Sequence, residues 1–168
     1  MDYSRVESYL DTFVNYEVLP GFGFAEDGYD LSHVAELMRR LGDPQIGPCT
    51  VHIAGSKGKG SVAAMVASAL TSCGVRTGLY TSPHIIHLGE RVQVDGAPAT
   101  PWEMSEALDF VKPHLEAMAT EGRWRRHTYF EILTALAFVH FRVSRINAQV
   151  IEVGLGGRLD ATNVVEPD

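Results

Sequence analysis

The strongest structural signal in this chain is the stretch Val51-His52-Ile53-Ala54-Gly55-Ser56-Lys57-Gly58-Lys59-Gly60-Ser61. Its apolar beginning is typical of a buried strand, its glycines of a tight turn, and its end of the first turn of a helix. Glycines let the backbone turn its N–H groups inward, and a helix N-terminus adds partial positive charge. A strand, loop and helix in this order therefore predict a phosphate-binding loop.

Two side chains of this loop have the chemistry of a nucleotide site. Lys59 would reach the terminal phosphates, and Ser61 would face a phosphate oxygen or a magnesium ion. The spacing differs from the commonest phosphate loop, G-x-x-x-x-G-K-[ST], because one residue separates Lys59 from Ser61. A plain Gly/Ser/Lys turn that binds nothing is the alternative interpretation of the same residues.

Composition narrows the class of protein. The 168 residues are enough for one domain, with or without an appendage, and 45% of them are hydrophobic. Their net charge of -7 repels nucleic acid and anionic membrane surfaces. The two cysteines, Cys49 and Cys73, indicate a reducing compartment and two small buried thiols. The chain shows no signal-peptide pattern and no apolar run of about 20 residues, so we expect a cytoplasmic protein.

Capping signals predict two helices ahead of the phosphate loop. Ser4 and Glu7 have the spacing of a capping box and precede apolar residues at helical intervals. Asp30 is placed to cap a second helix, which Gly42 ends. The aromatic residues of the glycine-rich segment 20–29, between the two helices, are expected to pack on the first of them.

The order of apolar segments predicts an α/β fold. Strands are expected at residues 49–54, 75–80 and 149–153, and a helix of small residues at 60–73 joins the first two. A strand, loop, helix and strand in this order force parallel pairing. We therefore predict an α/β fold with a parallel phosphate-loop sheet flanked by helices. Three parallel strands are few for a domain of this kind, so the domain is expected to be incomplete at its C-terminal end.

Two later segments have the pattern of helix starts. Thr100-Pro101-Trp102-Glu103 and Thr128-Tyr129-Phe130-Glu131 each place a glutamate three residues after a threonine, as in a capping box. The second precedes the apolar run 132–141, which is typical of a helix buried on most sides. Glu131 therefore has two interpretations, as the acid of the cap and as part of a ligand-facing helix start.

Polar residues follow the predicted strands at their carboxyl ends, where open parallel sheets place ligands. Thr81-Ser82-Pro83-His84 comes after the second strand, and its serine is either a metal ligand or part of a Ser-Pro turn. Glu152 interrupts the third strand near its end. An unpaired carboxylate there is costly, and the neighbouring phosphate loop makes Mg²⁺ its natural partner. The glycine-rich turn that follows brings Asp160 to the same rim.

Five blocks of the sequence occur in an informative order. They are Val-His-Ile-Ala-Gly-Ser-Lys-Gly-Lys-Gly-Ser at 51–61, Thr-Ser-Pro-His at 81–84, Glu-Arg-Val at 90–92, Thr-Tyr-Phe-Glu at 128–131, and Glu-Val-Gly-Leu-Gly-Gly-Arg-Leu-Asp-Ala-Thr-Asn at 152–163. Together these blocks resemble the folylpolyglutamate synthase and dihydrofolate synthase family of the Mur ligase superfamily. The last block is the most specific, and the opening helices match more loosely.

This resemblance implies an ATP-dependent ligase that adds L-glutamate to a folate or dihydropteroate carboxylate. The family phosphorylates the carboxylate with ATP, and the amine of glutamate then attacks the acyl phosphate to form the amide. Such chemistry depends on positioning and on neutralising developing charge. ATP and Mg²⁺ are the implied cofactors. The full-length protein is expected to be a monomer that binds neither nucleic acid nor membrane.

The resemblance also implies roles for single residues. Ser82 and Glu152 would bind Mg²⁺, while Lys59 and Asp160 would act at the reacting groups. The family loop has Thr-Asn where this chain has Ser56-Lys57, and the extra lysine suits anionic phosphate. The ATP phosphates would be held by Gly55, Ser56, Lys57, Gly58, Lys59, Gly60 and Ser61. The pterin pocket would be lined by Thr128, Tyr129, Phe130, Glu131, Leu159, Asp160 and Ala161.

The chain is shorter than proteins of this family. The resemblance assigns residues 1–45 to an N-terminal helical segment and 46–168 to the N-terminal part of the ATP-binding central domain. The family's metal-binding histidine, modified lysine, adenine-binding residues and glutamate-binding C-terminal domain have no counterpart here. We therefore expect an N-terminal piece of a longer protein, which alone would not catalyse the full reaction.

Other functions compete with this interpretation. Another Mur-type ligase, acting on a cell-wall precursor, is disfavoured by the Thr-Tyr-Phe-Glu and Leu-Asp-Ala blocks, which argue for a pterin substrate. A phosphate-loop kinase or GTPase is disfavoured because the sequence has neither a strand-terminal Asp-x-x-Gly nor Asn-Lys-x-Asp. A non-catalytic nucleotide-binding module stays open as the third alternative.

Overall fold

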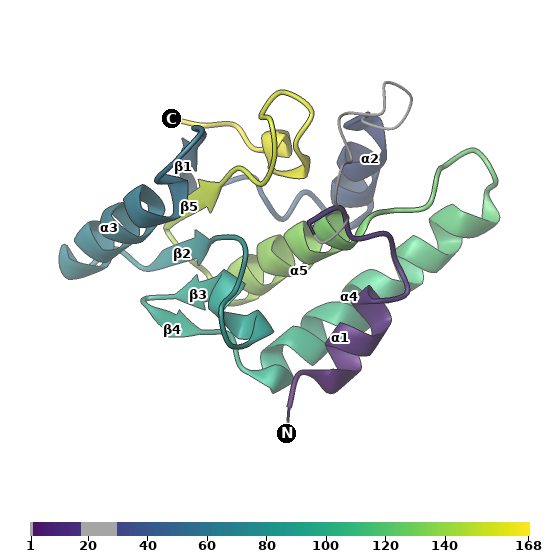
Figure 1. Ribbon diagram of the computed structural model, residues 1–168, viewed down its shortest axis with the longest axis horizontal. Helices are drawn as coiled ribbons and strands as arrows, with labels where there is room; N and C mark the ends of the chain where they lie inside the picture. The colour runs from purple at the N-terminus through teal and green to yellow at the C-terminus, as the bar shows by residue number, and fades with distance from the viewer. Residues whose placement is uncertain (1, 18–29) are drawn as a thin grey trace.

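A computed structural model shows the fold and describes residues 2–17 and 30–168. The expected packing of the aromatic residues in segment 20–29 lies outside the described residues. The described chain combines helices with the strands of a single sheet (Figure 1). They are α1 (Ser4–Leu10), α2 (Ser32–Arg40), β1 (Cys49–Ile53), α3 (Lys59–Ser72), β2 (Thr77–Tyr80), η1 (Leu88–Arg91), β3 (Val92–Val94), β4 (Ala97–Pro98), α4 (Pro101–Thr120), α5 (Tyr129–Val143), β5 (Ala148–Glu152) and η2 (Ala161–Val164).

The strands form one mixed sheet in the order β1-β5-β2-β3-β4. Both β1 and β2 pair in parallel with β5, so the three predicted strands and their parallel pairing are confirmed. The register places Ile53 opposite Glu152 and Tyr80 opposite Ile151, which brings the carboxyl ends of the three strands to one edge. The short strands β3 and β4 extend the sheet in antiparallel fashion beyond β2.

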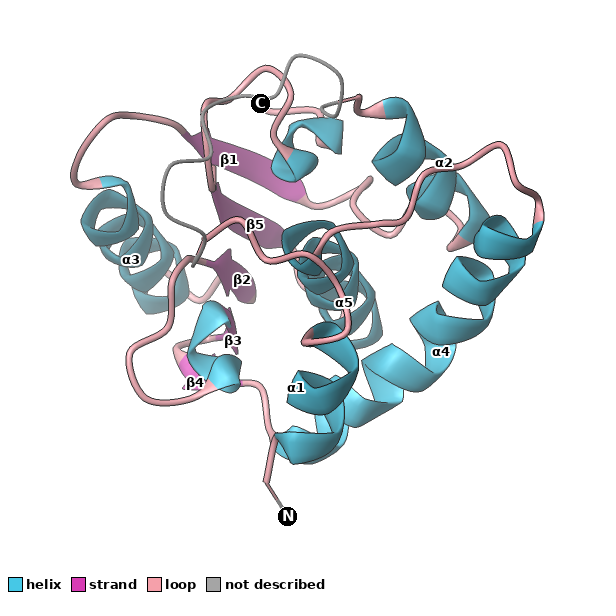
Figure 2. Ribbon diagram, turned by 45° about the vertical axis from the view of Figure 1, so that its right-hand side comes forward, coloured by secondary structure: helices cyan, strands magenta, loops and turns pink. Residues whose placement is uncertain are grey.

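Helices cover both faces of the sheet, as the α/β prediction required (Figures 1 and 2). On one face, α3 packs through the small residue Ala63 against Leu79 and Val150. On the other face, Tyr80 and Ile151 join the larger core that includes α4 and α5. Successive residues of a strand point to opposite faces, so each apolar strand supplies both cores. The strands β2 and β5 are accordingly buried along their whole length.

The capping boxes predicted at Thr100 and at Thr128 are both present. At the start of α4, Thr100 accepts the N–H of Glu103, and the Glu103 carboxylate accepts the N–H of Thr100 at 2.7 Å. At the start of α5, Thr128 and Glu131 make the same exchange. The predicted burial of the segment after Glu131 is also confirmed, because residues 131–141 are buried throughout.

The caps predicted for α1 and α2 are wrong. The Ser4 hydroxyl donates to the Asp2 carboxylate at 2.6 Å instead of accepting from the helix, and no side chain caps α1. Asp30 lies one position too early for α2, whose N-cap is Leu31; its carboxylate accepts the N–H of Ser32 at 2.8 Å. In both cases the side chain expected to cap the helix instead makes a hydrogen bond to a residue two positions away.

The expectation that both cysteines are buried is also wrong. Cys49 and Cys73 are free and exposed, because one opens the edge strand β1 and the other follows the last residue of α3. Across the ranges 2–17 and 30–168, none of the helices combines the length and the hydropathy needed to cross a membrane.

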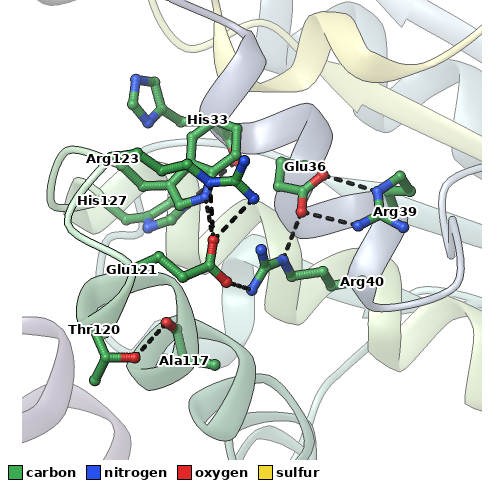
Figure 3. Close-up of polar contacts among 10 residues, drawn as sticks. His33, Glu36, Arg39, Arg40, Ala117, Thr120, Glu121, Arg123 and His127 are labelled. Atoms are coloured by element: carbon green, nitrogen blue, oxygen red, sulfur yellow. Dashed lines mark hydrogen bonds and ion pairs between the residues drawn. The ribbon is translucent and has the colours of Figure 1, made fainter.

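A cluster of ion pairs ties α2 to the end of α4 (Figure 3). Glu36 accepts hydrogen bonds from Arg39 and Arg40, which lower the pKa of Glu36 to about 2. Arg40 also pairs with Glu121 at 2.7 Å, and Glu121 accepts the indole N–H of Trp124 at 2.9 Å. Because these half-buried pairs join Glu36 and Arg40 of α2 to Glu121 at the end of α4, we interpret the cluster as orienting α2 against the α4–α5 connection.

Candidate active site

The predicted phosphate loop joins β1 to α3 at the edge where the parallel strands end. Residues 54–58 are exposed, and α3 begins at Lys59. Gly58 has φ 75°, a left-handed conformation that glycine adopts without strain. Within the described parts of the chain, no side chain caps the N-terminus of α3, so the N–H groups of its first turn are open to a ligand. This geometry is suited to binding an anion.

Ser82 and Glu152 meet beside this loop. The N–H of Ser82 donates to Oε2 of Glu152 at 3.0 Å, and Glu152 is only 4% exposed at the end of β5. Gly60 in the first turn of α3 lies against the same carboxylate, since a Cβ atom there would be 3.3 Å from Oε2. The start of α3, the segment after β2 and the end of β5 therefore converge on one buried carboxylate.

The residue types at this point, a carboxylate and a neighbouring serine, have the ligand chemistry of a magnesium site. Mg²⁺ in proteins is held by one or two carboxylate or hydroxyl oxygens, and waters and substrate phosphates complete its shell. Among the residues that the structure describes, no group of three or more His, Cys, Asp or Glu side chains is arranged to hold a metal. That part of the chain has no zinc-type cage, whereas Ser82 and Glu152 would supply the few ligands that a phosphate-bound Mg²⁺ needs.

A cavity of about 940 Å³ opens next to the phosphate loop and Ser82. Its volume lies within the range of small-molecule sites, about 300–1,000 Å³. Lys59 and Ser82 line one side, and α1 contributes Glu7. All seven residues predicted for the pterin pocket also line this cavity, namely Thr128, Tyr129, Phe130, Glu131, Leu159, Asp160 and Ala161. The fold thus brings residues from α1, the start of α3, the segment after β2, the start of α5 and the segment after β5 to one space.

The aromatic wall of the cavity depends on a glycine. Phe130 lies against Gly154, where an added Cβ would be 2.5 Å from the phenyl ring. The Phe130 ring is also 5.9 Å from the ring of Tyr80, measured between centroids. Any larger residue at position 154 would push Phe130 away. The glycine-rich turn after β5 therefore shapes the cavity as well as turning the chain.

Asp160 holds the turn between β5 and η2. It is 6% exposed, and its Oδ2 accepts the N–H of Leu155 at 2.8 Å. Its Oδ1 accepts the N–H of Thr162 at 2.9 Å, which caps η2. The Asp160 side chain therefore fixes the loop that forms one wall of the cavity, and it lines that cavity itself.

Glu131 is confirmed as the acid of the α5 cap, and its place beside the cavity leaves its role toward a ligand a prediction. It closes the cap of α5 with Thr128, and it also lines the cavity. Arg125 donates two hydrogen bonds to its carboxylate, one of them to Oε2 at 3.0 Å. A buried carboxylate needs such partners. The cap and the ion pair together fix the N-terminus of α5 beside the cavity.

Arg91 is a cavity residue to which our sequence analysis gave no role. Its side chain is only 3% exposed, and its two terminal nitrogens donate to the carboxylate of Glu17 at 2.8 and 2.6 Å. Its Nε lies 2.8 Å from Nδ1 of His84, and its guanidinium stands 5.7 Å from the centroid of the Tyr129 ring. The only sequence signal was its place in the block Glu90-Arg91-Val92.

Comparisons with known proteins agree with this geometry. No protein-family model matches the chain. The dihydrofolate synthase/folylpolyglutamate synthase of Bacillus subtilis is 37% identical over 166 residues, which are 98% of this chain and 36% of that protein. The folylpolyglutamate synthase of Lacticaseibacillus casei is 35% identical over 167 residues, which are 99% of this chain and 37% of that protein. This chain belongs to the folylpolyglutamate synthase and dihydrofolate synthase family.

Solved structures of the family share the fold of this chain. The folylpolyglutamate synthase of Thermotoga maritima superimposes with a TM-score of 0.86 at 36% identity over 98% of this chain and 36% of that one. A folylpolyglutamate synthase in complex with AMPPCP and folate gives a TM-score of 0.86 at 34% identity, over 99% of this chain and 38% of that one. The chain thus spans a little over a third of the length of each of these relatives.

Proposed function

We propose that this chain forms the phosphate-binding and pterin-binding part of an ATP-dependent ligase, which adds L-glutamate to the carboxylate of folate or dihydropteroate. One observation carries the proposal: Lys59, Ser82 and the seven residues expected at the pterin pocket line a single cavity. The names of the relatives and the complex with AMPPCP and folate support the same substrates. The complete reaction is proposed for the longer protein that the family resemblance implies.

The first step is phosphoryl transfer. A carboxylate oxygen of the pteroyl substrate attacks the γ-phosphorus of ATP, the bond to the bridging oxygen breaks, and ADP leaves with that electron pair. Lys59 and the N–H groups at the start of α3 would stabilise the charge that develops on the phosphate oxygens. Mg²⁺ held by Ser82 and Glu152 would neutralise charge on the β- and γ-phosphates.

The second step forms the amide. The amine of L-glutamate attacks the carbonyl carbon of the acyl phosphate, phosphate leaves with its bonding electrons, and the ammonium proton passes to solvent. Tyr129 and Phe130 would hold the flat pterin ring, since aromatic faces stack on such rings. Asp160 would accept hydrogen bonds from substrate N–H groups beside the reacting centre. These assignments keep both reactants in the cavity that the structure shows.

A cytoplasmic location and a monomeric state belong to the same proposal. The exposed free thiols of Cys49 and Cys73 favour a reducing compartment, where disulfides do not persist. The acidic net charge of -7 disfavours attachment to anionic membranes or nucleic acid.

The proposal is tested by turnover of the full-length protein. ADP release is measured with ATP, Mg²⁺ and L-glutamate, once with dihydropteroate and once with a reduced folate. We expect ADP release that requires glutamate, one of the two pteroyl substrates and Mg²⁺, and that stops when the metal is chelated. Turnover with a cell-wall precursor in place of both pteroyl compounds would instead support the other Mur-type ligase. Nucleotide binding without turnover on any acceptor would support the non-catalytic module.

A further inference from the structure

Three side chains form a hydrogen-bonded chain between β1 and the cavity. His52 lies within β1, and its Nε2 is 2.8 Å from Oγ1 of Thr162 in η2. The same hydroxyl donates to Oδ1 of Asp160, which lines the cavity. Thr162 is fully buried, so these hydrogen bonds run through the interior between β1 and the segment that carries Asp160. In Figure 1 the segment after β5 lies next to β1.

The donors and acceptors in this chain have a fixed direction. A carboxylate oxygen only accepts hydrogen bonds, so the single proton of the Thr162 hydroxyl goes to Asp160. The hydroxyl must then accept from His52, which places a proton on Nε2. Burial lowers the pKa of His52, which favours a neutral ring. His52 is therefore the Nε2–H tautomer.

The same bonds leave Asp160 one open acceptor. Its Oδ1 accepts from both the N–H and the hydroxyl of Thr162, and its Oδ2 accepts, from residues 2–17 and 30–168, only the N–H of Leu155. Each carboxylate oxygen has two acceptor sites. One site on Oδ2 therefore remains on a residue that lines the cavity.

His52, the first member of these hydrogen-bonded side chains, lies next to the phosphate loop. His52 precedes Ile53, the last residue of β1, after which the loop begins. A hydrogen bond from His52 to Thr162 therefore links the strand that carries the phosphate loop to the wall that carries Asp160. Catalysis of a two-substrate reaction depends on the relative placement of the reactants within fractions of an ångström.

We infer that His52 and Thr162 are positioning residues, whose hydrogen-bonded chain fixes the Asp160 carboxylate relative to the phosphate loop and presents its open acceptor to the pteroyl substrate. This inference rests on the proposed function for the identity of the ligand. It assigns a role to β1 beyond carrying the phosphate loop, and it makes the Thr162 hydroxyl the link.

The test compares two substitutions in the full-length protein. Thr162→Val removes the hydroxyl at nearly constant volume, and Thr162→Ser keeps it. We expect Thr162→Val to weaken the Kd for the pteroyl substrate about tenfold, the effect of losing one hydrogen bond to a charged group. The affinity for AMPPCP should stay within about twofold of the wild type in both variants. Thr162→Ser, which keeps the hydroxyl, should also keep the wild-type affinity for the pteroyl substrate. Equal pteroyl affinity in Thr162→Val and the wild type would overturn the positioning role.

A spectroscopic measurement tests the hydrogen-bonded chain without any substrate. Nitrogen-15 shifts of the labelled histidines report which ring nitrogen carries the proton, and His52→Gln assigns the His52 signals. We expect the Nε2–H tautomer in the wild type and in Thr162→Ser, and a shift toward the Nδ1–H tautomer in Thr162→Val. A bare Nε2 in the wild type would overturn the chain. If the wild type binds no pteroyl compound, the proposed ligand is wrong. The tautomer of His52 would still show whether His52 donates a hydrogen bond to Thr162.

Discussion

Lys59 is the residue on which nucleotide binding most depends in this account. It is the first residue of α3, and it lines the cavity shared with the expected pterin pocket. Lys57, two residues earlier, lies in the exposed part of the loop. Both lysines carry the charge that attracts phosphate, but they differ in position. The structure therefore allows them to be separated by experiment.

Replacing Lys59 with alanine should weaken ATP binding about tenfold or more, because a charge-assisted hydrogen bond to phosphate is lost. Lys57→Ala should have a clearly smaller effect and serves as the matched control. Calorimetric titration of the full-length protein with AMPPCP measures both. An unchanged affinity in Lys59→Ala would contradict the assignment of the phosphate loop.

Residue-scale contacts were predictable from the sequence only where strand order determines them. Ser82 follows β2 and Glu152 is the last residue of β5, and both strands end at one edge of a parallel sheet, so their meeting could be expected before the structure was known. The ion pair of Arg91 with Glu17 joins segments more than 70 residues apart through side-chain packing. No local pattern encodes such a pair, which is why Arg91 was not assigned a role.

At the scale of elements, the N-terminus of α5 serves both folding and the site. Thr128 and Glu131 close its capping box, and both line the cavity. The capping box of α4, formed by Thr100 and Glu103, has the same chemistry, and neither residue lines the cavity. The two caps therefore allow a comparison between a helix start that borders the cavity and one that does not.

Thr128→Ala and Thr100→Ala should each destabilise the fold by about 1 kcal/mol, the usual cost of losing a threonine cap. Only Thr128→Ala should also weaken binding of a reduced folate or dihydropteroate, because only that cap borders the cavity. Urea unfolding and substrate titration of the two variants measure both effects. Equal substrate affinity in the two variants would mean that the start of α5 does not contact the ligand.

Elements were predictable where a periodic pattern is long or a cap is complete. The apolar run after Glu131 correctly predicted α5, and the capping box that begins at Thr100 correctly predicted α4. Segment 90–94 alternates like a strand, yet Glu90 and Arg91 belong to the 3₁₀ helix η1 and only residues 92–94 pair with β2. The Glu90 carboxylate accepts backbone N–H groups of Ile85 and Ile86, and this local bonding overrides the alternation.

At the scale of the whole molecule, burial of histidines couples stability to pH. Burial is the main cause that lowers the pKa of five of them in the folded state: His33, His52, His84, His127 and His140. Their ordinary pKa is 6.5, so the unfolded chain binds protons at a higher pH than the folded chain does. The stability that these neutral histidines contribute is therefore full above pH 6.5 and is lost as the pH falls through the lowered pKa values.

The free energy of unfolding should decrease as the pH falls from about 7 to about 5. Urea unfolding at several pH values measures the slope, and His127→Asn should reduce it by removing one of the most buried imidazoles. A free energy of unfolding that does not change over this range would contradict the burial of neutral histidines. Carboxylates titrate mostly below this range, so they contribute little to the slope.

In the proposed reaction, ATP and a pteroyl carboxylate meet in the cavity lined by Lys59 at the start of α3, Ser82 after β2 and Gly154 after β5. The most direct measurement follows oxygen-18 from the carboxylate of dihydropteroate, or of a reduced folate, during turnover by the full-length protein with ATP, Mg²⁺ and L-glutamate. Mass spectrometry of the released phosphate should find one labelled oxygen for each amide formed, because the carboxylate oxygen passes to phosphate through the acyl phosphate. Amide formation with unlabelled phosphate, or with the label in AMP, would contradict the account.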